Sequence, residues 1–233
     1  MRRLLFLCSI LCLLLSTIVT VNAAPLAKSE KIAHYPLTSD AVDITGNNGD
    51  MTLTNAPFQD GGVYCNGIYP GGDPTATIVM TPEIVGLNPE SCAVSAEFKI
   101  SEYPPEAYRP VFMCGVNWRW LGVDIHLDGM LGLRYNNSTS IHTDVPVSLD
   151  TWHQVMVTYN GTTDSANLYL DGEWVTDAAF VCNHHDDQDI STHNGASGRQ
   201  FLGIFRNLIV YNGPVDPTPT DEQTWGAVKA LYR

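Results

Sequence analysis

The stretch 150–175 constrains the fold more than any other part of the chain. Apolar and polar residues alternate in two short segments there, as they do in strands that bury one face. Asn160-Gly161 ends the first segment and Asp171-Gly172 ends the second, and both dipeptides favour tight turns between antiparallel strands. The stretch therefore predicts a β-hairpin that continues into a third strand.

Short alternating segments separated by turn residues recur along most of the chain. They are 34–37, 51–55, 92–100, 111–116, 121–127, 131–135 and 201–212. Within 121–127, Leu121, Val123, Ile125 and Leu127 are predicted to face one side of a strand, with Asp124 and His126 on the other. Segment 201–212 has apolar residues on both faces, which indicates a central strand. The pattern predicts an all-β, two-sheet antiparallel sandwich.

Two parts of the sequence resemble laminin-G-like and pentraxin-like jelly rolls of the concanavalin A-like group. The resemblance is carried by Trp152-His153-x-Val155, Tyr159-Asn160-Gly161, Leu168-Tyr169-Leu170-Asp171-Gly172 and the segment 201–212. It covers roughly residues 34–212 and implies a jelly roll that binds glycans or proteins without catalysing a reaction. The resemblance also implies a binding site on the loops at one rim, often with calcium.

The N-terminus has the pattern of a secretory signal. Arg2 and Arg3 precede an apolar run over 4–15, and Ala23 offers a cleavage site, so we expect residues 1–23 to be removed on export. The apolar run is too short to span a bilayer, and we expect no membrane insertion. Residues 24–33 are an N-terminal extension and 34–212 the sandwich. Residues 213–233 are predicted to form a Pro-rich turn and a short C-terminal helix.

The charge balance excludes one class of partner. Asp and Glu number 25 against 12 Lys and Arg, a formal net charge of −13. Binding to nucleic acid needs clustered Lys and Arg, so nucleic acid is not an expected partner. An acidic surface keeps an exported protein soluble and also supplies oxygen ligands for calcium.

Four cysteines remain after signal removal, and an even number in an oxidising compartment predicts two disulfides. Three pairings are open. The pairing of Cys92 with Cys114, on consecutive strands, and of Cys65 with Cys182 is favoured here. The sequence has no Cys-x-x-Cys, which argues against a zinc or redox site.

Two acidic loops are candidate calcium sites. Asp187, Gln188 and Asp189 match the Glu-Gln-Asp loop that the pentraxin resemblance implies, with Gln200 as a further ligand. The other pentraxin ligands, an Asp-Asn pair, have no counterpart around 118–122, and a solvated acidic loop is the alternative. Nearby His184, His185 and His193 also suggest a zinc or copper site, although adjacent residues of an extended chain point oppositely.

The second loop, 40–50, is dense in Asp, Asn and Gly. Asp43 and Asn47 resemble the residues that hold a structural calcium after the first strand of laminin-G-like domains. Asp and Asn beside Gly also form ordinary turns by bonding to their own backbone, and this alternative stays open.

An aromatic platform is the candidate ligand site. Trp118 and Trp120 flank Arg119 and share one face if the chain is extended there. Sugars stack on such platforms, and the polar side chains of Asp124, His126 and Arg134 are placed to contact their hydroxyls. The alternative is that these tryptophans belong to the core. Sequons at Asn136, Asn137 and Asn160 are candidate glycosylation sites.

Catalysis is not expected from the sequence. Retaining glucanases of this group carry Glu-x-Asp-x-(x)-Glu on one strand, and the nearest run here is Asp124-x-His126-x-Asp128. Its two carboxylates would lie too far apart on a straight strand to form a retaining pair. We therefore expect a secreted carbohydrate-binding or adhesion module assisted by calcium, whose partner is a glycan or an extracellular protein. A self-associating structural subunit is the second expectation, and a polysaccharide hydrolase or lyase the third.

Overall fold

The computed structural model describes residues 29–68, 75–105, 108–115, 121–136, 139–182, 188–194 and 199–215. The predicted signal sequence and most of the Pro-rich turn with the C-terminal helix lie outside these ranges. No helix in the described residues is long and apolar enough to cross a membrane.

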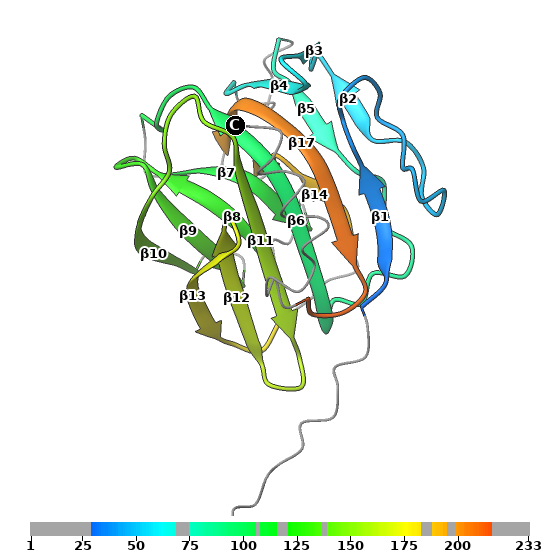
Figure 1. Cartoon of the computed structure of the whole chain (residues 1–233), viewed down its shortest axis with the longest axis vertical. Helices are drawn as coiled ribbons and strands as arrows, with labels where there is room; N and C mark the ends of the chain where they lie inside the picture. The colour runs from blue at the N-terminus through cyan, green and yellow to red at the C-terminus, as the bar shows by residue number, and fades with distance from the viewer. Residues whose placement is uncertain are drawn as a thin grey trace, which may run out of the picture.

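Two large antiparallel sheets make up most of the described part of the chain (Figure 1). Sheet A has the order β13 (Glu173–Ala179), β12 (Ser165–Leu170), β11 (His153–Asn160), β6 (Ser91–Ile100), β17 (Leu202–Tyr211), β4 (Gly62–Asn66) and β3 (Phe58–Gln59), with β1 (Lys31–Tyr35) also paired to β17. Sheet B has the order β10 (Thr139–Pro146), β9 (Met130–Tyr135), β8 (Leu121–His126), β7 (Tyr108–Cys114), β14 (Ile190–Ser191), β5 (Ile78–Met80) and β2 (Thr52–Thr54). A small third sheet pairs β15 (His193–Asn194) with β16 (Arg199–Gln200).

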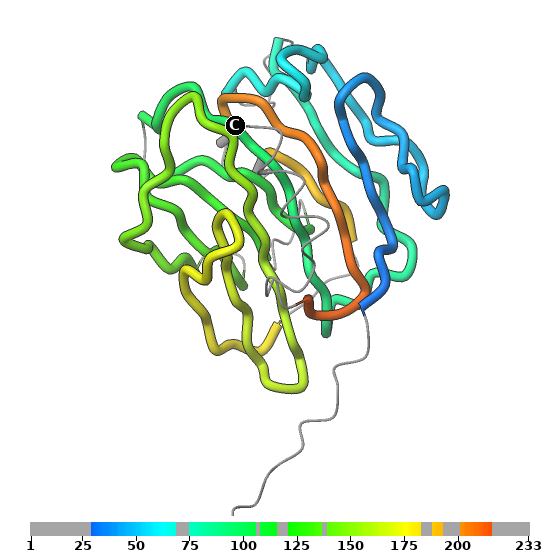
Figure 2. The backbone as a smooth tube through the Cα atoms, in the orientation of Figure 1, coloured from blue at the N-terminus to red at the C-terminus, as the bar shows by residue number. Residues whose placement is uncertain are grey.

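The prediction of an all-β sandwich is confirmed, and the described residues contain no helix. Strand β17 is central, as predicted, because it lies between β6 on one side and β4 and β1 on the other. The first and last described strands therefore run side by side, which the blue and orange segments of Figure 2 show.

The hairpin β11–β12 explains why its motif residues are needed. His153 Nδ1 lies 2.8 Å from Asp171 Oδ2, and the Gln154 amide donates to Asp171 Oδ1 at 2.8 Å. Asp171 has φ 52° and Gly172 φ 85°, the left-handed values of a tight two-residue turn, and this turn joins β12 to β13. The guanidinium carbon of Arg206 lies over the Trp152 ring, 3.8 Å from the ring centroid. Asp171 thus ties the start of β11 to the end of β12, and Asp171-Gly172 turns the chain from β12 into β13.

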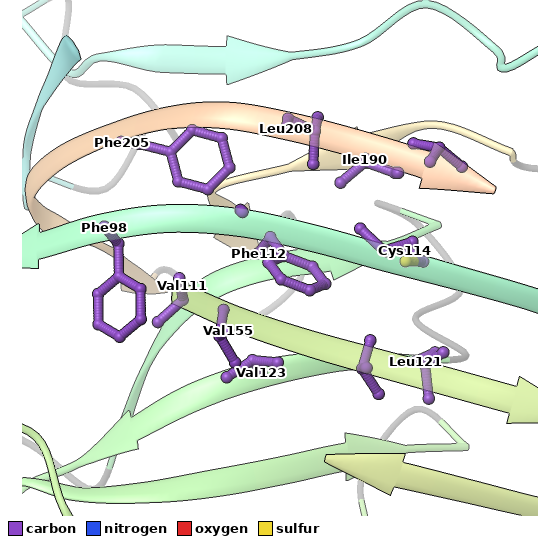
Figure 3. Close-up of a cluster of buried hydrophobic side chains, with 14 of the residues drawn as sticks. Phe98, Val111, Phe112, Cys114, Leu121, Val123, Val155, Ile190, Phe205 and Leu208 are labelled. Atoms are coloured by element: carbon purple, nitrogen blue, oxygen red, sulfur yellow. The ribbon is translucent and has the colours of Figure 1, made fainter. Parts of the chain in front are cut away.

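The core fills the space between the two sheets. Figure 3 shows Phe98 and Phe205 of sheet A with Phe112 and Val123 of sheet B, all of them buried. Leu121, Val123 and Ile125 face this core as the alternation predicted. The prediction for Leu127 was wrong, since its side chain is 60% exposed. Strand β8 ends at His126, and Leu127 already belongs to the turn that follows.

Candidate functional site

The outer face of sheet B carries a row of polar side chains. Core-facing residues alternate with outward residues along β8, so Asp124 and His126 point away from the core. The register places Asp124 of β8 opposite Gly132 of β9, and Gly132 opposite His142 of β10. A residue without a side chain therefore lies between an aspartate and a histidine.

Gly132 makes the space in which these groups meet. A Cβ atom added there would lie 2.1 Å from Asp124 Oδ1 and 2.6 Å from His126 Nε2, closer than any real contact. No other residue is compatible with this arrangement, because even alanine would displace both groups. The polar groups gathered around this position form the Gly132 cluster, which consists of Asp124, His126, Gly132, Arg134, Ser140 and His142.

Asp124 forms the buried base of the cluster. Its Oδ2 accepts a hydrogen bond from Arg134 Nε at 3.0 Å and one from Ser140 Oγ at 3.5 Å. Its Oδ1 has no hydrogen-bond partner among the described residues, although His126 Nε2 lies 3.2 Å away. A buried carboxylate oxygen without a donor is costly, and such exceptions often mark a functional site. Arg134 is held from the other side by the Tyr108 ring, 3.8 Å from the guanidinium carbon.

Two stacked histidines form the accessible rim. The rings of His126 and His142 lie 4.2 Å apart at their centroids with an interplanar angle of 22°. His142 is half exposed, and its Nε2 lies 3.0 Å from Asp128 Oδ2. Desolvation alone would raise the pKa of the Asp128 carboxyl, but hydrogen bonds from the Met130 amide and from His142 outweigh it and lower the pKa. The rim thus offers imidazole donors and acceptors beside a carboxylate.

The structure brings three of the predicted ligand residues together. Asp124, His126 and Arg134 are direct neighbours in the Gly132 cluster. Trp118, Arg119 and Trp120 lie outside the described residues. Sequence reasoning missed Ser140 and His142, although the alternation of polar and apolar residues over Ser140–Ile141–His142 is the signal that predicts their strand.

Asp43 is surrounded by protein donors. Its two carboxylate oxygens accept hydrogen bonds from the amides of His34, Thr45 and Asn48, the Thr45 hydroxyl and Asn48 Nδ2, at 2.7 to 3.0 Å. Burial alone would raise the pKa of this carboxyl, but these hydrogen bonds outweigh burial and lower the pKa to about 2. Asn47 Nδ2 donates to the Ile32 carbonyl at 3.3 Å. The structure uses both predicted calcium ligands as parts of a turn.

The second predicted calcium loop is only partly described. Asp187, His184 and His185 lie outside the described residues, and the side chains of Gln200 and His193 are not described. The carbonyl of Gln188 accepts from the Ile84 amide at 3.1 Å, and that of Asp189 accepts from the Gly115 amide at 2.8 Å. The described residues contain no group of three His, Cys, Asp or Glu side chains arranged to hold a metal ion. Calcium binding at this loop stays a prediction.

All four cysteines outside the signal sequence are buried free thiols in the structure, so the two predicted disulfides are absent from it. Cys65 Sγ lies 3.5 Å from Thr192 Oγ1. Cys92, Cys114 and Cys182 lie close enough to influence one another electrostatically, so Cys114 neighbours its predicted partner Cys92, whereas Cys182 neighbours these two thiols and Cys65 has other surroundings. Burial raises the pKa of the Cys65 and Cys182 thiols to about 12, which makes both unreactive at neutral pH.

The described sequons differ in what their amides do. Asn136 Nδ2, the nitrogen that glycosylation would modify, donates to the Val181 carbonyl at 3.1 Å. Asn160 Oδ1 accepts from the Thr162 amide at 2.9 Å at the tip of the β11–β12 hairpin. Asn137 lies outside the described residues. Glycosylation at any of the three stays a prediction.

A family model described as the concanavalin A-like lectin/glucanases superfamily matches residues 71–218, more than half of the chain. The chain belongs to this superfamily. The resemblance to laminin-G-like jelly rolls drawn from the hairpin and the closing strand is thereby confirmed. A search of curated proteins gives no match for this member of the superfamily.

Solved structures share the fold of this superfamily member at low sequence identity. Trypanosoma rangeli sialidase matches with TM-score 0.64 and 15% identity over 81% of this chain, which spans 31% of the sialidase chain. The botulinum neurotoxin type G receptor binding domain matches with TM-score 0.62 and 14% identity, over 86% of this chain and 52% of that domain. Domain 4 of AbnA, a GH43 extracellular arabinanase from Geobacillus stearothermophilus solved with arabinotriose, matches with TM-score 0.55 and 18% identity, over 82% of this chain and 97% of the domain.

Proposed function

We propose that the chain is an exported, non-catalytic carbohydrate-binding module that contacts its glycan through the Gly132 cluster. The observation that carries the proposal is the buried Oδ1 of Asp124, which has no hydrogen-bond partner and lies beneath the rim of His126 and His142. A sugar presents several hydroxyls that donate and accept at once, so it suits a rim of imidazoles and carboxylates.

Two further facts support a glycan as the ligand. The matching family model covers most of the sandwich. Domain 4 of the arabinanase AbnA, which was solved with arabinotriose, aligns with this chain over 97% of the domain's length. Asp124 and Arg134 are buried and ion-paired with each other, and we assign them to positioning the rim. The groups left for direct contact with a ligand are His126, Ser140 and His142.

Isothermal titration with arabinotriose and a glycan array test the proposal. We expect His142→Ala to weaken binding at least fivefold, since His142 is half exposed and its removal leaves the core intact. Gly132→Ala should abolish binding at the cluster, because the new Cβ occupies its centre. Asp144→Asn, on the same strand and also exposed, is the matched control. Full affinity in both variants of the cluster would refute the assignment.

Export, calcium assistance and the absence of catalysis belong to the same proposal. Each array is run in calcium and in chelator, and we expect tighter binding in calcium. Incubation with arabinan and other polysaccharides should release neither reducing ends nor unsaturated sugars. Expression of the whole chain in a secreting host should give a mature N-terminus at Ala24, read by mass spectrometry.

A further inference from the structure

The outer face of sheet A carries an exposed tryptophan on β13, beside a register shift in the pairing of β13 with β12. Trp174 of β13 is 58% exposed, while the next residue, Val175, packs against the hydrophobic core. On β12, Tyr169 lies between the buried Leu168 and Leu170 and so faces outward, and Trp174, its partner across the strands, shares that outer face. Its position is fixed by the strand, in contrast to an aromatic residue on a loop.

Trp174 has an aromatic neighbour and two polar ones on the same face. The register places it opposite Tyr169 of β12, and places Asp177 of β13 opposite Asn167 of β12. Tyr169 and Asn167 are two residues apart on one strand and therefore share a face, about 6.6 Å apart at their Cα atoms. These four residues, Asn167, Tyr169, Trp174 and Asp177, form the Trp174 platform.

The chemistry of the platform selects one class of ligand. An aromatic pair offers a flat apolar surface to the C–H face of a sugar ring, and an adjacent amide and carboxylate offer partners to its hydroxyls. The exposed Asp177 carries a negative charge on this face, so an anionic ligand would meet charge of its own sign. The geometry points to a second carbohydrate site on which a neutral sugar ring stacks over Trp174, with Asn167 and Asp177 bonding its hydroxyls.

The two sites face in opposite directions. The Gly132 cluster lies on the outer face of sheet B and the Trp174 platform on the outer face of sheet A, with the core between them. A module with both sites holds two glycan segments at once and cross-links soluble polysaccharide. The second site rests on the proposed function for its class of ligand, but on none of the same residues.

Titration of the full mature chain with arabinotriose, xylohexaose and cellohexaose tests the second site, with tryptophan fluorescence read in parallel. We expect quenching of indole emission by at least one of these sugars, and about tenfold weaker binding at the platform in Trp174→Ala. Trp174→Phe should recover most of the affinity, since it keeps a stacking ring. Val85→Ala, at a side chain that is 65% exposed, is the control for loss of exposed apolar surface.

The outcomes separate this inference from the proposed function. Binding lost in Gly132→Ala and unchanged in Trp174→Ala overturns the second site and leaves the first. The opposite pattern establishes the platform and removes the assigned first site. No binding of any neutral sugar by the wild type refutes both. If Trp174→Ala instead abolishes a concentration-dependent dimer in sugar-free size-exclusion runs, the platform is a contact between copies and the inference is wrong.

Discussion

Asp43 and Asp124 are both buried aspartates, and the sequence pointed to each as a candidate site residue. The hydrogen-bonding environments of the two differ. Asp43 accepts from donors on both carboxylate oxygens, whereas Asp124 Oδ1 has no hydrogen-bond partner in the described part of the chain. A carboxylate whose two oxygens both accept from its own loop is part of that loop, while a buried carboxylate oxygen without a hydrogen bond is an exception of the kind that marks a candidate site.

What separates the two aspartates is therefore the number of hydrogen-bond donors and not burial, since both are buried. The donors to Asp43 come from its own turn and from His34 of the neighbouring strand β1, so Asp43 ties the loop to the sheet. The partners of Asp124 are side chains of three adjacent strands that face outward. Such side chains can adjust when a ligand arrives, but backbone amides of a closed turn cannot.

The largest expected effect is that of Asp43→Asn on stability. The amide NH₂ would replace one acceptor oxygen and face protein donors, which leaves at least two buried donors unpaired. We expect the free energy of unfolding to fall by about 3 kcal/mol in urea denaturation. Asp40→Asn, at an exposed position of the same loop, should change it by less than about 0.5 kcal/mol. Equal small effects of both would contradict the structural role of Asp43.

The acid dependence of stability gives the second effect. The pKa of Asp43 is lowered from 3.8 to about 2 in the folded protein, so its contribution is full above pH 4 and is lost as the pH falls through 2. We expect a loss of about 2 kcal/mol over that window from this group. The loss should be absent in Asp43→Asn and retained in Asp124→Asn when urea midpoints are measured from pH 5 to pH 2. If stability depended on pH identically in the wild type, Asp43→Asn and Asp124→Asn, the acid-dependent loss would not come from Asp43.

Much of the fold was predictable because it depends on local patterns. The hairpin of β11 and β12, the core-facing side of β8 and the central place of β17 follow from period-two alternation and from turn dipeptides. The cluster depends instead on cross-strand register. Gly132 opposes Asp124 and His142 only once β8, β9 and β10 are aligned, and no local pattern states that alignment. The donors to Asp43 could not be predicted either, because three of the five are backbone amides, whose positions depend on the folded loop and not on residue type.

A smaller effect is expected from Asp124→Asn. The amide oxygen can still accept from Arg134, and the NH₂ group takes the place of an oxygen that has no donor. We expect a loss of about 1 kcal/mol in unfolding free energy, because an ion pair becomes a hydrogen bond from the Arg134 guanidinium to a neutral amide. The free energy of glycan binding should fall by more than the free energy of unfolding. Isothermal titration measures the first and urea denaturation the second. A loss above about 3 kcal/mol would instead make Asp124 as structural as Asp43.

The smallest expected effect concerns calcium and Asn47. The side-chain amide of Asn47 donates to the Ile32 carbonyl, and the nearby Asp43 oxygens already accept from protein groups. A cation entering this turn would have to displace N–H donors whose positive ends face the same oxygens. Any rise in Tm that calcium gives over chelator should therefore be the same, within about 1 °C, in Asn47→Ala as in the wild type. If Asn47→Ala erases a calcium-dependent rise in Tm, the loop 40–50 holds a cation, and the Asp43 oxygens are not fully occupied by protein donors.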